Sequence, residues 1–336
     1  MQTRQIVFTA PNQSELQIVD ALLAPGPGEV ALELAYTLIS PGTELACLAG
    51  TEQWARMPFV PGYAGVGTVS AVGAGVTHLR EGDVAFSYTR HASHALSRTV
   101  ALPVPAGLDL RQAIFARMAA VAMTALRVSD AELGDHVAIY GLGLVGNLAA
   151  QLFTLAGCEV IGIELSPHRC ELARACGVAH AIDPAAVDPV AYVKEITHGR
   201  MCGTVVEAIG LSPLAVEAAK LASNLGEVIL LGSPRAPFET DVTPLLRDIH
   251  LWDSGCVTYK GAHEWRLPTR HDPSGRVKHS IERNCEIILG LIASGKLHVA
   301  TLLSHVISPV ACQEAYLGLR DRKDVYLGVL FDWSQV

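Results

Sequence analysis

The feature that most constrains this chain is a run of 22 residues, Val137 to Cys158, without a charged side chain. A run of this length can span a bilayer as a helix. It also divides into a short β-branched strand, VAIY, a glycine-rich turn and an apolar helix. Irregularly spaced glycines weaken an isolated helix, so we favour the second division and expect no membrane span. An uncharged strand and helix are typical of a parallel sheet that is covered on both faces.

The glycine turn in this run has the spacing of a dinucleotide-binding loop, G-x-G-x-x-G, directly after a strand. In such a loop the first glycine permits a tight turn, the second lets the backbone approach a pyrophosphate, and the third lets helix pack closely on strand. Amide groups at the start of the helix favour phosphate. An ordinary strand-to-helix turn can show the same glycines. The predicted cofactor contacts are Gly141, Gly143, Leu144, Val145 and Gly146.

The next strand supports the cofactor interpretation, because EVIGIEL brings Glu164 to a position 23 residues after Gly141. A carboxylate there can accept hydrogen bonds from both hydroxyls of an adenosine ribose. Its charge opposes the 2′-phosphate of NADP, so we expect NAD as the cofactor and NADP as the weaker alternative. Arg169 lies five residues further on. Its cation either offsets part of that repulsion or belongs to a solvated helix face.

Length and composition predict a folded chain of two domains. The 336 residues exceed the size at which one core is efficient, about 250–300, and 50% of them are hydrophobic against 17% charged, which excludes disorder. Up to about residue 110, short alternating stretches broken by glycine and proline predict a β-barrel. Strands and helices alternate after that. The predicted fold class is α/β, a β-barrel domain plus a doubly wound parallel sheet.

Charge, cysteines and the N-terminus exclude several function classes. The net charge is −8, and no basic stripe is present, so we expect no nucleic-acid partner. Eight scattered cysteines without a Cys-x-x-Cys pair disfavour a disulfide scaffold and a cysteine-rich zinc site. The opening MQTRQIVFTAP alternates like a strand and lacks a secretion signal. These features predict a cytoplasmic protein without a membrane partner.

Several motifs together resemble the medium-chain dehydrogenase/reductase superfamily, which contains zinc alcohol dehydrogenases and quinone oxidoreductases. They are Pro41-Gly-Thr-Glu44, the glycine-rich block from Pro61 to Gly73, Gly82-Asp83, the turn at Gly141 and the terminal LGVLFDW. The resemblance implies a GroES-like catalytic domain over residues 1–123, a Rossmann domain over 124–277 and a C-terminal return over 278–336. It also implies an active site in the cleft between the domains and a homodimer formed at the strand near Lys260.

The chain departs from this family where zinc ligands are expected. Pro41 stands where the zinc enzymes have Cys, and Tyr63 stands where they have His. A further ligand, usually four residues before a Thr, falls on Ala120 ahead of Thr124. The cysteine-rich lobe of a structural zinc is also missing, because residues 86–99 contain no Cys. We therefore expect no metal site and no zinc.

Two histidine pairs stand outside these positions. His91 and His94 are three residues apart, and His263 is adjacent to Glu264. Either pair can be imagined as a metal site, but no further ligand set accompanies it. We interpret these residues as partly exposed loop histidines.

Without zinc, the resemblance leaves four candidate catalytic residues. Thr43 occupies the family's proton-relay hydroxyl position, and Tyr63 either donates a hydrogen bond to the substrate oxygen or fills the vacated metal pocket. Glu44 either orients Tyr63 or makes a structural bond to backbone. Ala46 replaces a relay His of some members. His263 follows a stretch that resembles the strand beside the nicotinamide, so it is either a general acid or an interface or solvent-facing histidine.

A basic stretch reverses the chain's overall charge. Between Lys260 and Arg283 there are six Lys or Arg residues against three acids. This segment is either a solvated face or a site that receives an anionic group of the substrate.

We therefore expect a zinc-independent oxidoreductase that transfers hydride between NAD(P) and a carbonyl or secondary-alcohol carbon of a small, activated substrate. Without a Lewis acid an unactivated alkoxide is hard to stabilise. Two alternatives stay open. One is an enone or quinone reductase of the same superfamily, and the other is a catalytically silent protein that binds NAD(P)H.

Overall fold

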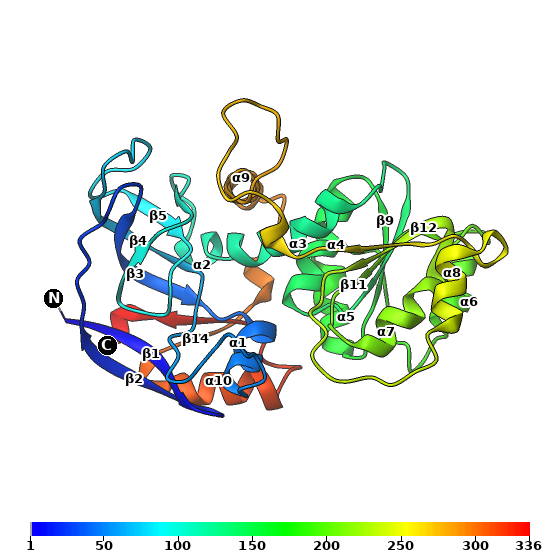
Figure 1. The fold of residues 1–336 in the computed structure, drawn as a ribbon, viewed down its shortest axis with the longest axis horizontal. Coiled ribbons are helices and arrows are strands. Elements are labelled where there is room, and N and C mark those ends of the chain that lie inside the picture. Colours follow the sequence, from blue (N-terminus) through cyan, green and yellow to red (C-terminus); the bar gives the residue numbers. More distant parts are fainter. Residues whose placement is uncertain (1) are drawn as a thin grey trace. The chain divides into compact units, whose positions relative to one another are not determined.

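The computed structural model describes residues 2–336, which form two compact units (Figure 1). Unit 2 comprises Met118–Arg266, and unit 1 comprises the chain before it and Leu267–Val336. Unit 2 therefore begins and ends earlier in the sequence than the predicted Rossmann domain, residues 124–277. The first boundary falls within helix α3, Ala116–Val128.

Unit 2 is built on a six-stranded, wholly parallel sheet (Figure 1). Its strand order is β10-β9-β8-β11-β12-β13. The chain starts at β8 in the middle of the sheet, adds β9 and β10 on one side, and then returns to add β11, β12 and β13 on the other side. This is the Rossmann arrangement, in which ligands bind beyond the carboxyl ends of the strands at the reversal. The strands are β8 (His136–Tyr140), β9 (Glu159–Ile163), β10 (His180–Ile182), β11 (Cys202–Glu207), β12 (Ala222–Leu230) and β13 (Thr258–Gly261).

Helices connect these strands, and the uncharged run supplies the central pair. Its first part is β8, and its second part is α4, Leu144–Leu155, whose side chains from Leu148 to Phe153 are all buried. The predicted strand, turn and helix are therefore confirmed. No helix within residues 2–336 is long and apolar enough to cross a bilayer. The other helices are α5 (Pro167–Ala175), α6 (Pro189–Ile196), α7 (Ser212–Glu217) and α8 (Thr243–His250).

Unit 1 is mainly β-structure, as predicted. A seven-stranded sheet has the order β14-β15-β3-β4-β5-β7, with β6 paired to β3, and β1 and β2 form a separate antiparallel pair. The strands are β1 (Gln2–Ala10), β2 (Gln13–Asp20), β3 (Val30–Leu38), β4 (Gly65–Val72), β5 (Val84–Ser87), β6 (His94–Ser97), β7 (Ala101–Pro103), β14 (Leu303–Ile307) and β15 (Gly328–Asp332).

The C-terminal part of the chain completes this sheet, because β15 pairs antiparallel with β3. One buried apolar cluster joins both ends of the sequence, from Ile6 and Phe8 to Phe331 and Trp333. The C-terminal return is therefore needed to close the core of unit 1. Its helices are α1 (Pro41–Leu48), α2 (Leu110–Ala113), α9 (Ile281–Ala293) and α10 (Cys312–Asp321).

Candidate active site

A cluster of hydroxyl groups lies where α1 begins, just after β3. Ser40 is the N-cap of α1, and Pro41 takes the first helical position, where its missing N–H costs nothing. The Tyr63 hydroxyl donates to Ser40 Oγ, and the Thr43 side chain lies near enough to the phenol to lower its pKa. The structure therefore brings the predicted residues Thr43 and Tyr63 together.

Glu44 lies beneath this cluster and is 2% exposed. Its Oε1 accepts from the backbone N–H of Ser40 at 2.8 Å. Its Oε2 accepts from the Tyr316 hydroxyl at 2.6 Å and lies 2.9 Å from His91 Nε2. The Ser40 N–H, the Tyr316 hydroxyl and the His91 ring surround the Glu44 carboxylate. Glu44 therefore does not make the expected direct contact with Tyr63 but is linked to it through Ser40. The alternative, a bond from Glu44 to backbone, is present.

Burial and the neighbouring Glu44 carboxylate hold the pKa of Tyr316 well above its usual range. Its hydroxyl therefore stays protonated and donates to Glu44. Tyr316 was not predicted, and it comes from α10, 272 residues after Glu44.

His91 lies in a loop, as expected, but the expectation that it is partly exposed is wrong. Its side chain is fully buried and lies 2.9 Å from the Glu44 carboxylate. Gly62 makes this packing possible, since a Cβ at that position would lie 2.5 Å from the His91 backbone nitrogen. Gly62 also has a φ of +97°, which glycine adopts without strain. His94, by contrast, lies in β6 and is only partly buried.

A buried cation borders Tyr63. The Arg117 guanidinium lies 4.5 Å from the ring centroid of Tyr63 and 4.3 Å from that of Tyr88, and the residue is 4% exposed. Such stacking of a guanidinium on aromatic faces is attractive. Sequence reasoning did not select Arg117. The available signal was a lone charge in the apolar stretch IFARMAAVAMTAL.

The side chains around Tyr63 do not fit a zinc ion. Zinc in proteins takes three or four ligands from Cys, His and carboxylates. Here Glu44 and His91 contact each other, and the other neighbours are hydroxyls and the Arg117 cation. Thr124 directs its hydroxyl to the Ala120 carbonyl of its own helix. Across residues 2–336 no three His, Cys, Asp or Glu side chains form a group that could hold a metal.

The glycine turn of unit 2 has the geometry of a phosphate-binding loop. Gly141 has a φ of +86°, and a Cβ on it would lie 2.4 Å from the Ile209 side chain. A Cβ on Gly146 would lie 1.8 Å from the Gly141 carbonyl oxygen. Gly143 is the N-cap of α4, so the N–H groups of Leu144, Val145 and Gly146 in its first turn have no partner within the helix. These residues fit a dinucleotide pyrophosphate.

Glu164 follows β9 and faces this turn. Its Oε2 accepts from the Leu142 N–H at 2.9 Å, and its Oε1 accepts from the Ser166 N–H at 3.0 Å. Arg169 Nη1 lies 3.7 Å from Oε2, and the two side chains are 19% and 10% exposed. Arg169 is therefore not a solvated helix charge. The carboxylate is fixed beside the loop and keeps lone pairs for ribose hydroxyls.

A second carboxylate at this edge was missed by sequence reasoning. Glu207 ends β11 and is 1% exposed. Its Oε1 accepts from the N–H groups of Ile209 at 2.9 Å and Gly210 at 2.8 Å. Burial raises the pKa of Glu207. These bonds fix the turn whose Ile209 packs on Gly141. The sequence signal was an acid at the end of an apolar strand, TVVE, shortly before a glycine.

His263 belongs to unit 2, where it follows β13 and is exposed. Thr43, Glu44 and Tyr63 belong to unit 1. Nearby, Lys260 lies 2.5 Å from Asp130 and 2.6 Å from Glu227, so its charge is already balanced.

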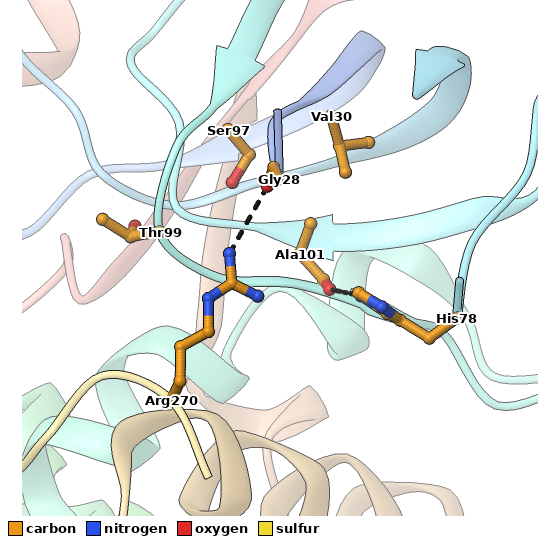
Figure 2. A pocket seen from close by; sticks show the side chains of 7 residues that line it. All are labelled: Gly28, Val30, His78, Ser97, Thr99, Ala101 and Arg270. Atoms are coloured by element: carbon orange, nitrogen blue, oxygen red, sulfur yellow. Dashed lines mark hydrogen bonds between the residues drawn. The ribbon is translucent and has the colours of Figure 1, made fainter. Parts of the chain in front are cut away.

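Arg270, another cation of the basic stretch, lies in unit 1. Its guanidinium points toward the Gly28 carbonyl at 3.4 Å (Figure 2). It also lies 3.7 Å from the Glu282 carboxylate. The pocket that it lines together with His78 has a volume of about 10 Å³, which holds about one water. This pocket is too small for an organic anion.

Comparisons with known proteins identify both units. The alcohol dehydrogenase GroES-like domain family matches residues 26–123, and the zinc-binding dehydrogenase family matches residues 145–267. A zinc-type alcohol dehydrogenase-like protein of Haemophilus influenzae is 30% identical over 180 residues, 53% of this chain and 50% of its own. An alcohol dehydrogenase of Geobacillus stearothermophilus is 30% identical over 213 residues, 53% of this chain and 62% of its own. The matches thus cover about half to three fifths of these relatives.

A D-guloside 3-dehydrogenase of Escherichia coli aligns over more of the chain. It is 27% identical over 279 residues, 79% of this chain and 76% of its own. Among solved structures, the benzyl alcohol dehydrogenase of Acinetobacter calcoaceticus has a TM-score of 0.83 at 20% identity and covers 99% of both chains, which shows the same fold. With both family models matched and the fold shared over its full length, this chain belongs to the medium-chain dehydrogenase/reductase superfamily.

Proposed function

We propose that this protein is an NAD(P)-dependent oxidoreductase that reduces a carbonyl, or oxidises the corresponding secondary alcohol, without zinc. The observation that carries the proposal is the Ser40–Thr43–Tyr63 hydroxyl cluster with Arg117 stacked on Tyr63. These groups occupy the part of the chain where the family resemblance leads one to expect zinc ligands. Relatives named alcohol, sorbitol and D-guloside dehydrogenases support a hydroxyl or carbonyl substrate.

We assign cofactor binding to unit 2. The N–H groups after Gly143 would hold the pyrophosphate, and Glu164 would hold the adenosine ribose. Because Arg169 already lies beside Glu164, the positive charge of Arg169 is partly compensated and is less available to a 2′-phosphate. This arrangement favours NAD over NADP.

A bound nicotinamide supplies or accepts the hydride. In reduction, negative charge develops on the substrate oxygen and needs a donor. Burial raises the pKa of Tyr63, so its phenol is protonated at neutral pH and can donate. Hydroxyl groups rotate freely, so the Tyr63 O–H can turn from Ser40 to the substrate. Ser40 and Thr43 can then donate to the phenolate oxygen that remains.

Metal removal and a substrate panel test this proposal. The protein is dialysed against a strong chelator, its zinc content is measured, and NADH oxidation is followed with ketones, activated ketones, enones and quinones. We expect NADH binding and turnover of a ketone with less than one zinc per ten chains. Activity that is lost with the metal and restored by zinc would contradict it.

The same panel separates the alternatives. Turnover restricted to enones or quinones would identify a conjugate reductase, in which charge spreads into an enolate. NADH binding without turnover of any compound would identify a silent binding protein. Either result would replace the proposed function.

We also propose a homodimer formed along β13. Within the described sheet this strand pairs with β12 alone, and an open edge can accept another strand. Light scattering should give twice the 35.7 kDa of one chain, and a mass of one chain would contradict this assembly.

A further inference from the structure

Arg117 is a buried cation held against the proposed proton donor. It lies in the first turn of α3 in an otherwise apolar stretch, is 4% exposed, and has one tyrosine ring on each side at 4.5 and 4.3 Å. The Tyr88 hydroxyl lies 3.4 Å from Cys285 Sγ. Burying a guanidinium is costly unless its charge is used or compensated. Its position on Tyr63 indicates a role in the behaviour of that phenol.

Charges of both signs face Tyr63. Arg117 stacks on its ring from α3, and Glu44 of α1 is linked to its hydroxyl through Ser40. Burial raises the pKa of the phenol, the Arg117 charge lowers it, and the Glu44 charge raises it. The other titratable groups of this packing lie one layer further out: His91 and Tyr316 on Glu44, and Tyr88 on Arg117.

We propose that Arg117 is a positioning residue that holds the Tyr63 ring by stacking and stabilises the negative charge that Tyr63 acquires when it gives up its proton. This inference rests on the proposed function. In carbonyl reduction the carbon receives hydride from NAD(P)H, and the substrate oxygen takes the Tyr63 O–H proton, so an alcohol and a phenolate form. The phenolate then takes a proton from water. Arg117 keeps its own proton throughout and acts through its charge alone.

The test measures ionisation of residue 63 directly. 3,5-Difluorotyrosine, nearly isosteric with tyrosine and ionising at lower pH, is placed at position 63, and its fluorine resonance is titrated by NMR. We expect Arg117→Met to raise the midpoint by about one pH unit, since an adjacent cation shifts a pKa by that order. Arg117→Lys, which keeps the charge, should move it less. Arg111→Met, a change of an exposed arginine, should leave it unchanged.

Glu44→Gln adds a sign test, because loss of the negative charge should lower the same midpoint. Circular dichroism confirms folding of each variant, and Arg117→Gln replaces Arg117→Met if the latter does not fold. If residue 63 titrates with the same midpoint in the native protein and in Arg117→Met or Arg117→Gln, the inference is overturned.

Kinetics separate this inference from the proposed function. In the unlabelled protein Arg117→Met should lower kcat/KM by up to about tenfold for each unit by which the midpoint rises, with NADH affinity unchanged. If the midpoint does not move although Tyr63→Phe abolishes turnover, the role of Arg117 is refuted and the proposed function stands. If Tyr63→Phe is fully active, the proposed donor is refuted whatever the titration shows.

Discussion

His91 Nε2 lies 2.9 Å from Glu44 Oε2, and both side chains are buried, at 0% and 2% exposure. The carboxylate also accepts from Tyr316 and from the backbone of Ser40. Glu44 therefore joins the start of α1 to α10 and to the loop before β6. This contact fixes the backbone from which Ser40 and Thr43 meet Tyr63.

Removing this carboxylate should destabilise the protein strongly. Glu44→Ala leaves three buried donors without their acceptor, which costs about 3–5 kcal/mol for a buried pair of this kind. Urea unfolding followed by circular dichroism measures the loss. Glu81→Gln, at an exposed position, should stay within about 0.5 kcal/mol of the native protein. A loss below about 1 kcal/mol for Glu44→Ala would show that the cluster does not support unit 1.

Stability should fall at alkaline pH because buried tyrosines resist ionisation. The folded protein raises the pKa of Tyr316 well above its usual range and those of Tyr140 and Tyr259 to about 12. The unfolded chain ionises them near pH 10, so their contribution is complete below that pH and is lost as the pH rises toward the folded values.

Urea unfolding from pH 8 to 11 checks this expectation. The slope of the unfolding free energy against pH should be negative above about pH 10 and shallower in Tyr316→Phe. An identical slope in both proteins would mean that Tyr316 ionises as readily in the folded state as in the unfolded chain.

The third glycine of the turn should tolerate no side chain. Gly146→Ala would place a methyl group 1.8 Å from the Gly141 carbonyl oxygen, so the loop must shift. We expect at least tenfold weaker NADH binding, measured by nucleotide fluorescence. Gly290→Ala lies in α9 with no heavy atom within 4 Å of the new Cβ, and should bind NADH normally and be more stable by about 0.5–1 kcal/mol. Normal binding by Gly146→Ala would refute the pyrophosphate assignment.

Glu164 should set the preference between the two nicotinamide dinucleotides. Glu164→Gln removes the charge that opposes a 2′-phosphate and that pairs with Arg169, so the ratio of NADPH to NADH affinity should rise about tenfold, or about 1.4 kcal/mol. Titration of both cofactors measures this ratio. Glu171→Gln, an exposed change on α5, should leave it as it is. An unchanged ratio for Glu164→Gln would place the ribose elsewhere.

The candidate cofactor-binding residues of unit 2 were predictable because they are close in sequence. The strand, the glycine turn, α4 and Glu164 lie within one βαβ unit, and their spacing follows from the geometry of that unit. Burial of the uncharged run was predictable for the same reason. Glu207 could not be placed as readily, because its bonds to the turn at Ile209 depend on how the backbone closes after β11.

In unit 1, only some residues of the candidate site were predictable from the sequence. Thr43, Glu44 and Tyr63 were found through short motifs, but the partners that define their chemistry come from distant segments. His91 is 47 residues from Glu44, and Tyr316 is 272 residues away. His91 was misjudged as partly exposed because its packing against Gly62, where no Cβ has room, cannot be seen in the sequence. Tertiary packing decides such contacts.

Whether Tyr63 is the proton donor is decided by the effect of Tyr63→Phe on kcat/KM for carbonyl reduction by the metal-free protein. Loss of the phenol proton should lower kcat/KM about 100- to 1,000-fold while NADH affinity stays unchanged. Tyr36→Phe, the matched control in β3, should remain active. A Tyr63→Phe protein that reduces the same carbonyl at the native rate would show that another group supplies the proton.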